Sequence, residues 1–265
     1  MHTFDLCLIP LLTHCKHFVL QQQRKNVKTY RLLRHPHVCT FHSYFETEDH
    51  CFLVMEYCPH GDLQTLLHRR RRLTEPEVAY YLGHILEALH YLHHKQMRCG
   101  HVQLSHCLID RQGQVKLGGW GGVHGRQQLE YCAPELVCGG QETSVEADVW
   151  SLGVCLYALL VGRTPFAGPD RTTTLQRIVE NQYPSDDVVV SNVAWELMGG
   201  LLRTSPMDRC VSTGRYFLVL FAYQSALCSQ LLQINLGRSC CTSFFSPLLT
   251  TGTPAVDDGD SSCLG

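Results

Sequence analysis

The stretch Met97–Asp110, MRCGHVQLSHCLID, together with Val115–Gly121, VKLGGWG, decides the fold of this chain. It follows a segment that ends in Tyr91-Leu92-His93 and whose apolar residues recur at helical spacing. The short apolar runs Cys107–Ile109 and Val115–Leu117, separated by turn residues, predict two short strands. The expected order is therefore helix, loop, strand, turn and strand.

This order resembles the catalytic core of the eukaryotic protein kinases, in which the loop reads H-R-D-L-K-x-x-N and the second strand leads into D-F-G. The motifs LRHPHV, TEPE, YLH, APE, DVWSLGV and VGRTPF also follow one another in the order of that family. The likeness is to Polo-like, Tribbles and calcium/calmodulin-dependent or AMPK-related kinases. The resemblance implies an α+β fold, with a mainly helical C-lobe and a truncated β-sheet remnant of the N-lobe.

The positions that carry the chemistry of the family hold other residues here. His101 stands at the position of the catalytic aspartate, Gln103 at the lysine, His106 at the asparagine and Gly119 at the D-F-G aspartate. Phosphoryl transfer depends on Mg²⁺ ions held by that asparagine and aspartate. Gly119 cannot ligate a metal, and His106 favours softer metals than Mg²⁺. We therefore expect no intact catalytic residue, no metal, and ATP and Mg binding that is lost or very weak.

The segment before the helical region lacks the phosphate-binding signals of the family. Neither G-x-G-x-x-G nor V-A-I-K precedes Asn26, which itself stands at the position of the αC glutamate. Cys39–Phe45 and Cys51–Tyr57 are rich in aromatic and β-branched residues, which predicts a β-hairpin. Thr3–Ile9 and His17–Leu20 are weaker candidates for strands. In the resemblance, Glu56 and Tyr57 are a remnant of the hinge that holds adenine.

Two capping boxes predict the starts of the principal helices. In Thr74–Glu77 the threonine and the glutamate can satisfy each other's backbone amides, and in Thr143–Glu146 the same arrangement is expected. The second box precedes a run, residues 145–160, that is apolar nearly all round, as in a helix buried at the centre of a domain. Further helices are expected at Leu63–His68, Thr173–Asn181 and Ala194–Leu202.

Four more positions acquire a role from the resemblance. Asp148 matches the aspartate that anchors the catalytic loop through backbone N–H groups, and Glu135 and Arg209 match a structural ion pair of the C-lobe. Leu108 matches the residue that packs beneath adenine. All four are equally consistent with ordinary core residues, and this is the interpretation we prefer.

Composition narrows the class of protein. Hydrophobic residues make up 45% of the 265 residues, charged residues only 17%, and the formal net charge is −2, so no global field attracts nucleic acid. Fifteen scattered cysteines favour reduced thiols in the cytoplasm or the nucleus over a disulfide framework. The run Arg69–Arg72 is interpreted as a solvated helix end rather than a nucleic-acid or nuclear-import patch.

The predicted domain occupies residues 26–210, with an N-lobe remnant at 26–57 and a C-lobe at 58–210. Residues 1–25 are unassigned, and residues 211–265 are expected to be a disordered or aberrant tail, as in an altered transcript. Within this tail the uncharged stretch 216–237 is long enough to span a bilayer, but its glutamines and serines argue against a membrane span.

The resulting hypothesis is a pseudokinase that binds a protein partner as a scaffold, through its hinge-side groove and its αG region, which the resemblance places at the expected helix Thr173–Asn181. One alternative is a residual or unconventional Ser/Thr kinase, and another is a non-functional truncated isoform. Cys99, His101, His106 and Cys107 have the residue types of a zinc site, but they lack the paired C-x₂-C spacing of structural sites.

Overall fold

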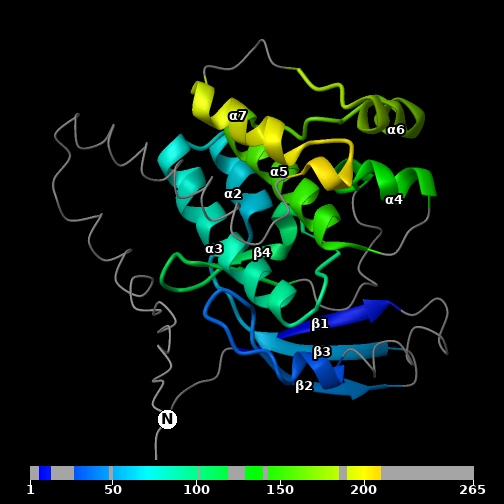
Figure 1. The fold of residues 1–265 in the computed structure, drawn as a ribbon. Coiled ribbons are helices and arrows are strands. Elements are labelled where there is room, and N and C mark those ends of the chain that lie inside the picture. The colour runs from blue at the N-terminus through cyan, green and yellow to red at the C-terminus, as the bar shows by residue number, and fades with distance from the viewer. Residues whose placement is uncertain are drawn as a thin grey trace, which may run out of the picture. The chain divides into compact units, whose positions relative to one another are not determined.

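A three-stranded antiparallel sheet forms the N-terminal part of the fold, in the order β1-β3-β2 (Figure 1). Its strands are β1 (Leu6–Leu12), β2 (Phe41–Glu46) and β3 (His50–Glu56). The predicted hairpin is confirmed as β2 and β3. It does not stand alone, because β1, which overlaps the weaker candidate Thr3–Ile9, pairs with the other edge of β3 from Leu6 opposite Glu56 to Leu12 opposite His50. The candidate His17–Leu20 lies outside the described residues.

The computed structural model describes residues 6–12, 27–47, 50–100, 102–118, 129–139, 143–184 and 190–209, with the backbone alone at 6–12, 50 and 51. All of them lie in the first of two units, Met1–Gln224, and the second unit, Ser225–Gly265, lies outside the described residues. The stretch 216–237 also lies outside them. Within the described ranges, no helix combines the length and the apolar character that crossing a membrane requires.

Helices α2 (Leu63–Arg70) and α3 (Glu75–His94) follow the sheet. Asp62 caps α2 by accepting a hydrogen bond from the Thr65 amide at 2.7 Å. The predicted capping box of α3 is confirmed, since one carboxylate oxygen of Glu77 accepts from both the amide and the hydroxyl of Thr74, at 2.9 and 2.8 Å. Through these contacts the backbone amides of Thr65 and Thr74, which have no partner within the helix, find hydrogen-bond acceptors.

Helix α5 (Val145–Val161) is the centre of the helical region, and α3 and α7 (Asn192–Leu201) contact it. It is buried all round from Ala147 to Leu160, as its apolar sequence predicts. The predicted capping box at Thr143 is wrong, because the N-cap is the next residue, Ser144, whose hydroxyl accepts from the Ala147 amide at 3.1 Å.

Shorter elements complete the fold. Strands β4 (Cys107–Ile109) and β5 (Val115–Leu117) form the predicted two-stranded ladder. The rest are the 3-10 helices η1 (Leu104–His106), η2 (Leu129–Tyr131) and η3 (Pro206–Asp208) and the helices α4 (Pro134–Gly139) and α6 (Arg171–Glu180). The predicted α+β class, mainly helical with a small β-sheet part, is confirmed.

A cluster of histidines joins the segment before β2 to the helical region. The rings of His37 and His84 stack with centroids 4.1 Å apart. His37 donates from Nδ1 to the Val115 carbonyl at 3.0 Å, and Nδ1 of His84 accepts from the Val115 amide at 3.1 Å. His84 must therefore stay neutral at Nδ1 to keep this contact, and burial, together with His37, lowers its pKa to about 3.

Candidate functional site

Asp148 of α5 holds the loop that follows α3. Its carboxylate, 1% exposed, accepts hydrogen bonds from the backbone amides of Cys99 at 2.9 Å and Gly100 at 2.7 Å. Nε2 of His93, at the end of α3, lies 2.8 Å from the same carboxylate. Because these three groups replace the water that a buried carboxylate loses, Asp148 can remain inside the fold and fix the start of the loop.

Gly100 makes this loop conformation possible. Its φ is +68°, in the left-handed region where a side chain is strained. A Cβ atom at this position would also lie 2.8 Å from Cγ2 of Thr143, which is closer than real contacts allow. A residue with a side chain at this position would be strained and would clash with Thr143.

Gln103 and His106 contact each other at the positions of the family's lysine and asparagine. Nε2 of Gln103 lies 2.9 Å from the Ser105 hydroxyl and 3.0 Å from Nε2 of His106. An amide nitrogen can only donate, so Nε2 of His106 accepts and carries no proton. This neutral pair uses the lone pair with which His106 could have bound a metal.

Two other predicted positions, His101 and Gly119, lie outside the described residues, as does Asn26. The two cysteines of the alternative zinc site are both buried. The thiol of Cys107 donates to the Gln103 carbonyl at 3.3 Å, and burial raises its pKa well above the ordinary value. In the described ranges no cluster of three or more His, Cys, Asp or Glu side chains is arranged to hold a metal ion.

The predicted hinge remnant is tied to strand β5 by an ion pair. The carboxylate of Glu56 lies 2.8 Å from Nζ of Lys116 in β5 and accepts from the Thr40 amide at 3.2 Å. Burial acts to raise the pKa of the Glu56 carboxyl, but the Lys116 ammonium and the hydrogen bonds of Thr40 together lower it. Tyr57 is 45% exposed, and Leu108 is half-buried in β4, where it forms an isolated β-bridge with Asp62.

Glu135 and Arg209 form a buried bidentate ion pair. Both guanidinium nitrogens lie 2.6 Å from a Glu135 oxygen, and the exposed fractions of the two side chains are 11% for Glu135 and 0% for Arg209. The guanidinium also stacks over the Trp150 ring, 5.1 Å from its centroid. Its remaining hydrogen bonds go to three backbone carbonyls, those of Arg203, Glu146 and Thr204. The pair therefore joins α4 to the chain that follows α7.

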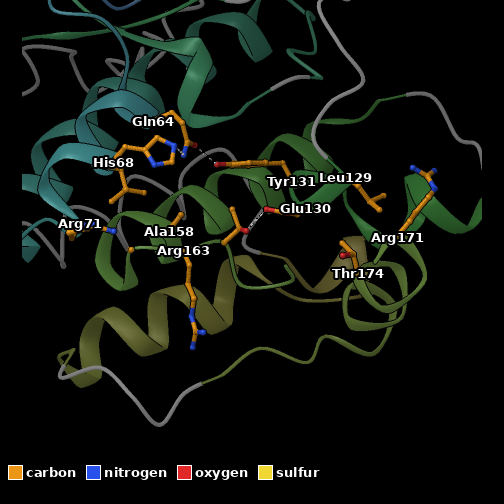
Figure 2. Close-up of a pocket in the computed structure, with 13 residues that line it drawn as sticks. Gln64, His68, Arg71, Leu129, Glu130, Tyr131, Ala158, Arg163, Arg171 and Thr174 are labelled. Atoms are coloured by element: carbon orange, nitrogen blue, oxygen red, sulfur yellow. Dashed lines mark hydrogen bonds between the residues drawn. The ribbon is translucent and has the colours of Figure 1, made fainter. Parts of the chain in front are cut away.

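A cavity of about 730 Å³ lies between α2, η2, the end of α5 and the start of α6 (Figure 2). Sequence reasoning did not find it, because its lining comes from four segments far apart in the chain. The basic run Arg69–Arg72 was the available signal, but it was interpreted as solvated. Only Arg71 of that run lines the cavity.

Of the four positions at which the family's catalytic residues are replaced, the structure brings together two, Gln103 and His106. They follow the part of the loop that Asp148 holds. The remaining predicted residues form two separate places in the fold. Glu56, Tyr57 and Leu108 lie on the hinge side, whereas Glu135 and Arg209 lie beside α4. None of these residues lines the cavity.

Comparisons with known proteins show which family has this arrangement of motifs and elements. The family described as "Protein kinase domain" matches residues 13–216. The chain is 32% identical over 196 residues to Serine/threonine-protein kinase PLK2 of Mus musculus, which covers 70% of the chain and 28% of that protein. It is 33% identical over 201 residues to Probable serine/threonine-protein kinase CCRP1 of Zea mays, which covers 71% and 32% respectively.

A further relative is NUAK family SNF1-like kinase 2 of Homo sapiens, 30% identical over 206 residues, which covers 73% of the chain and 33% of that protein. The matched part of the chain therefore spans about a third or less of these relatives. The predicted likeness to Ser/Thr kinases is confirmed at the level of the superfamily. By the match of its domain and by these relatives, the chain belongs to the protein kinase family.

Proposed function

We propose that this chain is a catalytically inactive protein kinase-like domain, a pseudokinase, which binds a protein partner as a scaffold or regulator in signalling. The observation that carries the proposal is the contact between Gln103 and His106. Two positions at which the family places a cation and a metal ligand hold an uncharged pair here. The loop nevertheless keeps its attachment to Asp148.

The described residues do not fit a nucleotide with its Mg²⁺. Mg²⁺ prefers carboxylate and other oxygen ligands in octahedral geometry. His106, at the position of the family's metal-binding asparagine, instead offers a ring nitrogen, and that nitrogen lies 3.0 Å from the amide nitrogen of Gln103. Without the lysine, the charge that develops on a transferred phosphoryl group also lacks one of its partners in the family's mechanism. We therefore derive no phosphoryl transfer step for this chain.

The scaffold role is supported by what the chain retains. The buried pair of Glu135 and Arg209 and the contacts of Asp148 stabilise the helical region without any contribution from a nucleotide. The cavity beside α6 offers a binding surface in the αG region that the sequence suggested. The formal net charge of −2 argues for a protein partner over nucleic acid.

Phosphate transfer and nucleotide binding on the same protein test this proposal. The full chain is incubated with radiolabelled ATP, Mg²⁺ or Mn²⁺ and generic protein substrates, with an active relative as the positive control. Its thermal midpoint is measured with and without ATP and Mg²⁺. We expect no transfer above background and no stabilisation by nucleotide, and transfer that responds to a substitution in the loop would contradict the proposal.

A residual Ser/Thr kinase is the second candidate, because the relatives are named as Ser/Thr kinases. Stabilisation by ATP with Mg²⁺, together with transfer that His101→Ala abolishes, would establish this alternative. Histidine near neutral pH could act as a general base, which is worth on the order of 10²–10⁴-fold. The matched control is His94→Ala, since His94 is an exposed histidine at the end of α3.

A further inference from the structure

Cys39 and Cys58 face each other where the chain before β2 meets the chain after β3. Cys39 lies two residues before β2, and Cys58 lies two residues after β3. The Cys39 thiol donates to the Glu56 carbonyl at 3.5 Å and shares a hydrogen bond with the Cys58 thiol. Both thiols are free in the structure. Two sulfurs in hydrogen-bonding contact are an arrangement from which a disulfide can form.

Backbone hydrogen bonds hold both cysteines in place. The Glu56 amide donates to the Thr40 carbonyl at 2.9 Å, which continues the pairing of β2 with β3 by one step. Counted from there, Cys58 comes one residue past the position opposite Cys39. The Cys39 amide also donates to the Leu117 carbonyl of β5 at 2.9 Å. Directly opposite residues have Cα atoms about 4.5–5.5 Å apart and a disulfide spans about 4.4–6.8 Å, so an offset of one residue stays within reach.

The two thiols differ in acidity and in access. The hydrogen bond from Cys39 lowers the pKa of the Cys58 thiol, and the Lys116 ammonium acts in the same direction against burial. That hydrogen bond and burial raise the pKa of the Cys39 thiol well above its ordinary value. Cys58 is 8% exposed and Cys39 only 2%. Because the thiolate is the form that reacts with oxidants, Cys58 is suited to attack first and Cys39 to follow.

Other described thiols lack this acidity. Burial raises the pKa of the thiols of Cys107, Cys132 and Cys155, which disfavours their thiolates. Cys58 therefore differs from these three in its readiness to react. Where thiols are kept reduced, the disulfides that do form are typically transient and redox-sensing. A pair of free thiols of unequal acidity fits that class.

We propose that Cys39 and Cys58 form a reversible disulfide when the protein meets hydrogen peroxide, which makes this pair an oxidative modification site. The Cys58 thiolate attacks one peroxide oxygen, the O–O bond breaks, and the leaving hydroxide takes up the proton that the thiol had released. The Cys39 sulfur then attacks the sulfur of the Cys58 sulfenic acid, the S–O bond breaks, and the leaving hydroxide takes the Cys39 proton. Two thiols and one peroxide thus give one disulfide and two waters, and a thiol reductant reverses the bond by exchange.

The disulfide closes a ring that contains the whole hairpin of β2 and β3. Such a ring restricts the unfolded chain more than the folded one, so oxidation should stabilise the sheet. The predicted hinge remnant, Glu56 and Tyr57, lies inside the ring and next to the bond. The inference goes beyond the proposed function, because it holds whether or not the domain transfers phosphate.

Peptide mapping of the full chain tests the pair directly. The reduced protein is treated with hydrogen peroxide, its remaining thiols are blocked with N-ethylmaleimide, and it is cleaved with trypsin and Glu-C without reductant. These proteases place Cys39, Cys51 and Cys58 in separate fragments, 35–46, 49–56 and 57–69. We expect the first and the third fragment to be joined and dithiothreitol to release them. A bond from either cysteine to Cys51 or to any other cysteine instead would overturn the inference.

Substitutions separate the roles of the two sulfurs. In Cys39→Ser, Cys58 should be trapped as the sulfenic acid and labelled by dimedone, whereas in Cys58→Ser the Cys39 thiol should stay unlabelled. Cys138→Ser is the matched control and should leave the disulfide unchanged, because Cys138 is an exposed cysteine of α4. Oxidation should raise the thermal midpoint of the wild type by roughly 5–10 °C and leave that of Cys39→Ser unchanged. Dimedone labelling of Cys39, or a midpoint that does not rise when the bond forms, would overturn the inference.

Discussion

Two regions of the molecule differ in the charge of the side chains that are in contact: the anchors of the helical region, and the loop positions at which the family's charged residues are replaced. Around Asp148 and Arg209 the charges are buried, and each has several hydrogen-bonding partners at 3.2 Å or less. Around Gln103 and His106 the side chains in contact are neutral. The comparison teaches that the residues that hold the start of the loop are not the residues at the replaced positions, so the loop can keep its attachment when those positions change.

The largest loss of stability is expected when the buried ion pair of Glu135 and Arg209 is broken. Arg209→Met removes the partner of Glu135 and leaves three backbone carbonyls without their donor. Breaking a buried pair from one side costs about 3–5 kcal/mol, because the remaining charge is uncompensated. The free energy of unfolding, measured by urea denaturation, should fall by that amount. Arg203→Gln, an exposed neighbour, is the control, and a loss below about 1 kcal/mol in Arg209→Met would contradict the prediction.

Asp148→Asn should have the next largest effect. Asparagine has nearly the same size, but it presents one acceptor oxygen where the carboxylate serves Cys99, Gly100 and His93. At least one buried amide then faces a donor, and lost hydrogen bonds to a charged group cost about 2–3 kcal/mol. Hydrogen exchange at the Cys99 and Gly100 amides should accelerate with the loss of stability. Unchanged protection of both amides would show that the carboxylate does not hold the loop.

Protonation of His84 at acid pH should weaken the contact that this residue of α3 makes with Val115 and His37. Its pKa is lowered to about 3 by burial and by His37, so the native state keeps it neutral while the unfolded chain takes up a proton below about pH 6.5. This contribution to stability is present above about pH 6.5 and is lost as the pH falls toward 3. Burial is also the main cause that lowers the pKa of His35 to about 4. Because His35 is more solvated than His84, we expect it to contribute less to the pH dependence of stability.

Between pH 7.5 and 5 we expect a loss of about 1–2 kcal/mol from His84, measured as the free energy of unfolding at constant ionic strength. His84→Asn is the informative variant, because its amide oxygen can accept from the Val115 amide without titrating. The variant should show a shallower pH dependence over this range. An equally steep profile in the variant would assign the acid sensitivity to other groups.

The helices could be predicted because their signals are local. Thr74 and Glu77 lie within one turn, and the apolar run of α5 is continuous, so short-range patterns specify both. The sequence pattern predicts the N-cap of α5 one residue too early, because Thr143 and Ser144 are adjacent hydroxyl residues. Side-chain chemistry alone does not distinguish them, and Thr143 packs against Gly100 instead.

The bounds and pairing of strand β1 and the presence of the cavity could not be predicted, because both depend on partners far along the chain. The sequence of β1, LCLIPLL, lacks alternation, and Pro10 argues against a central strand. It is tolerated because β1 is at the edge of the sheet. At the loop, the sequence indicates that the charged groups are gone. It does not indicate that Gln103 and His106 contact each other, which depends on how η1 turns.

The smallest effect should be found at Gln103, and it is the sharpest test of the comparison. Gln103→Leu keeps the volume of a side chain that is 6% exposed and removes its donors to Ser105 and His106. Two neutral hydrogen bonds are lost, but His106 is half-buried and water can replace its partner, so we expect a cost of about 1 kcal/mol. Phosphate transfer should stay at background in the wild type and in the variant alike.

A loss of stability as large as that of Asp148→Asn would mean that the neutral pair also shapes the loop. Leucine retains the packing at this position, so only the hydrogen bonds change. Gln103 would then belong with Asp148 among the residues that hold the loop, and the distinction between anchoring residues and replaced residues would fail.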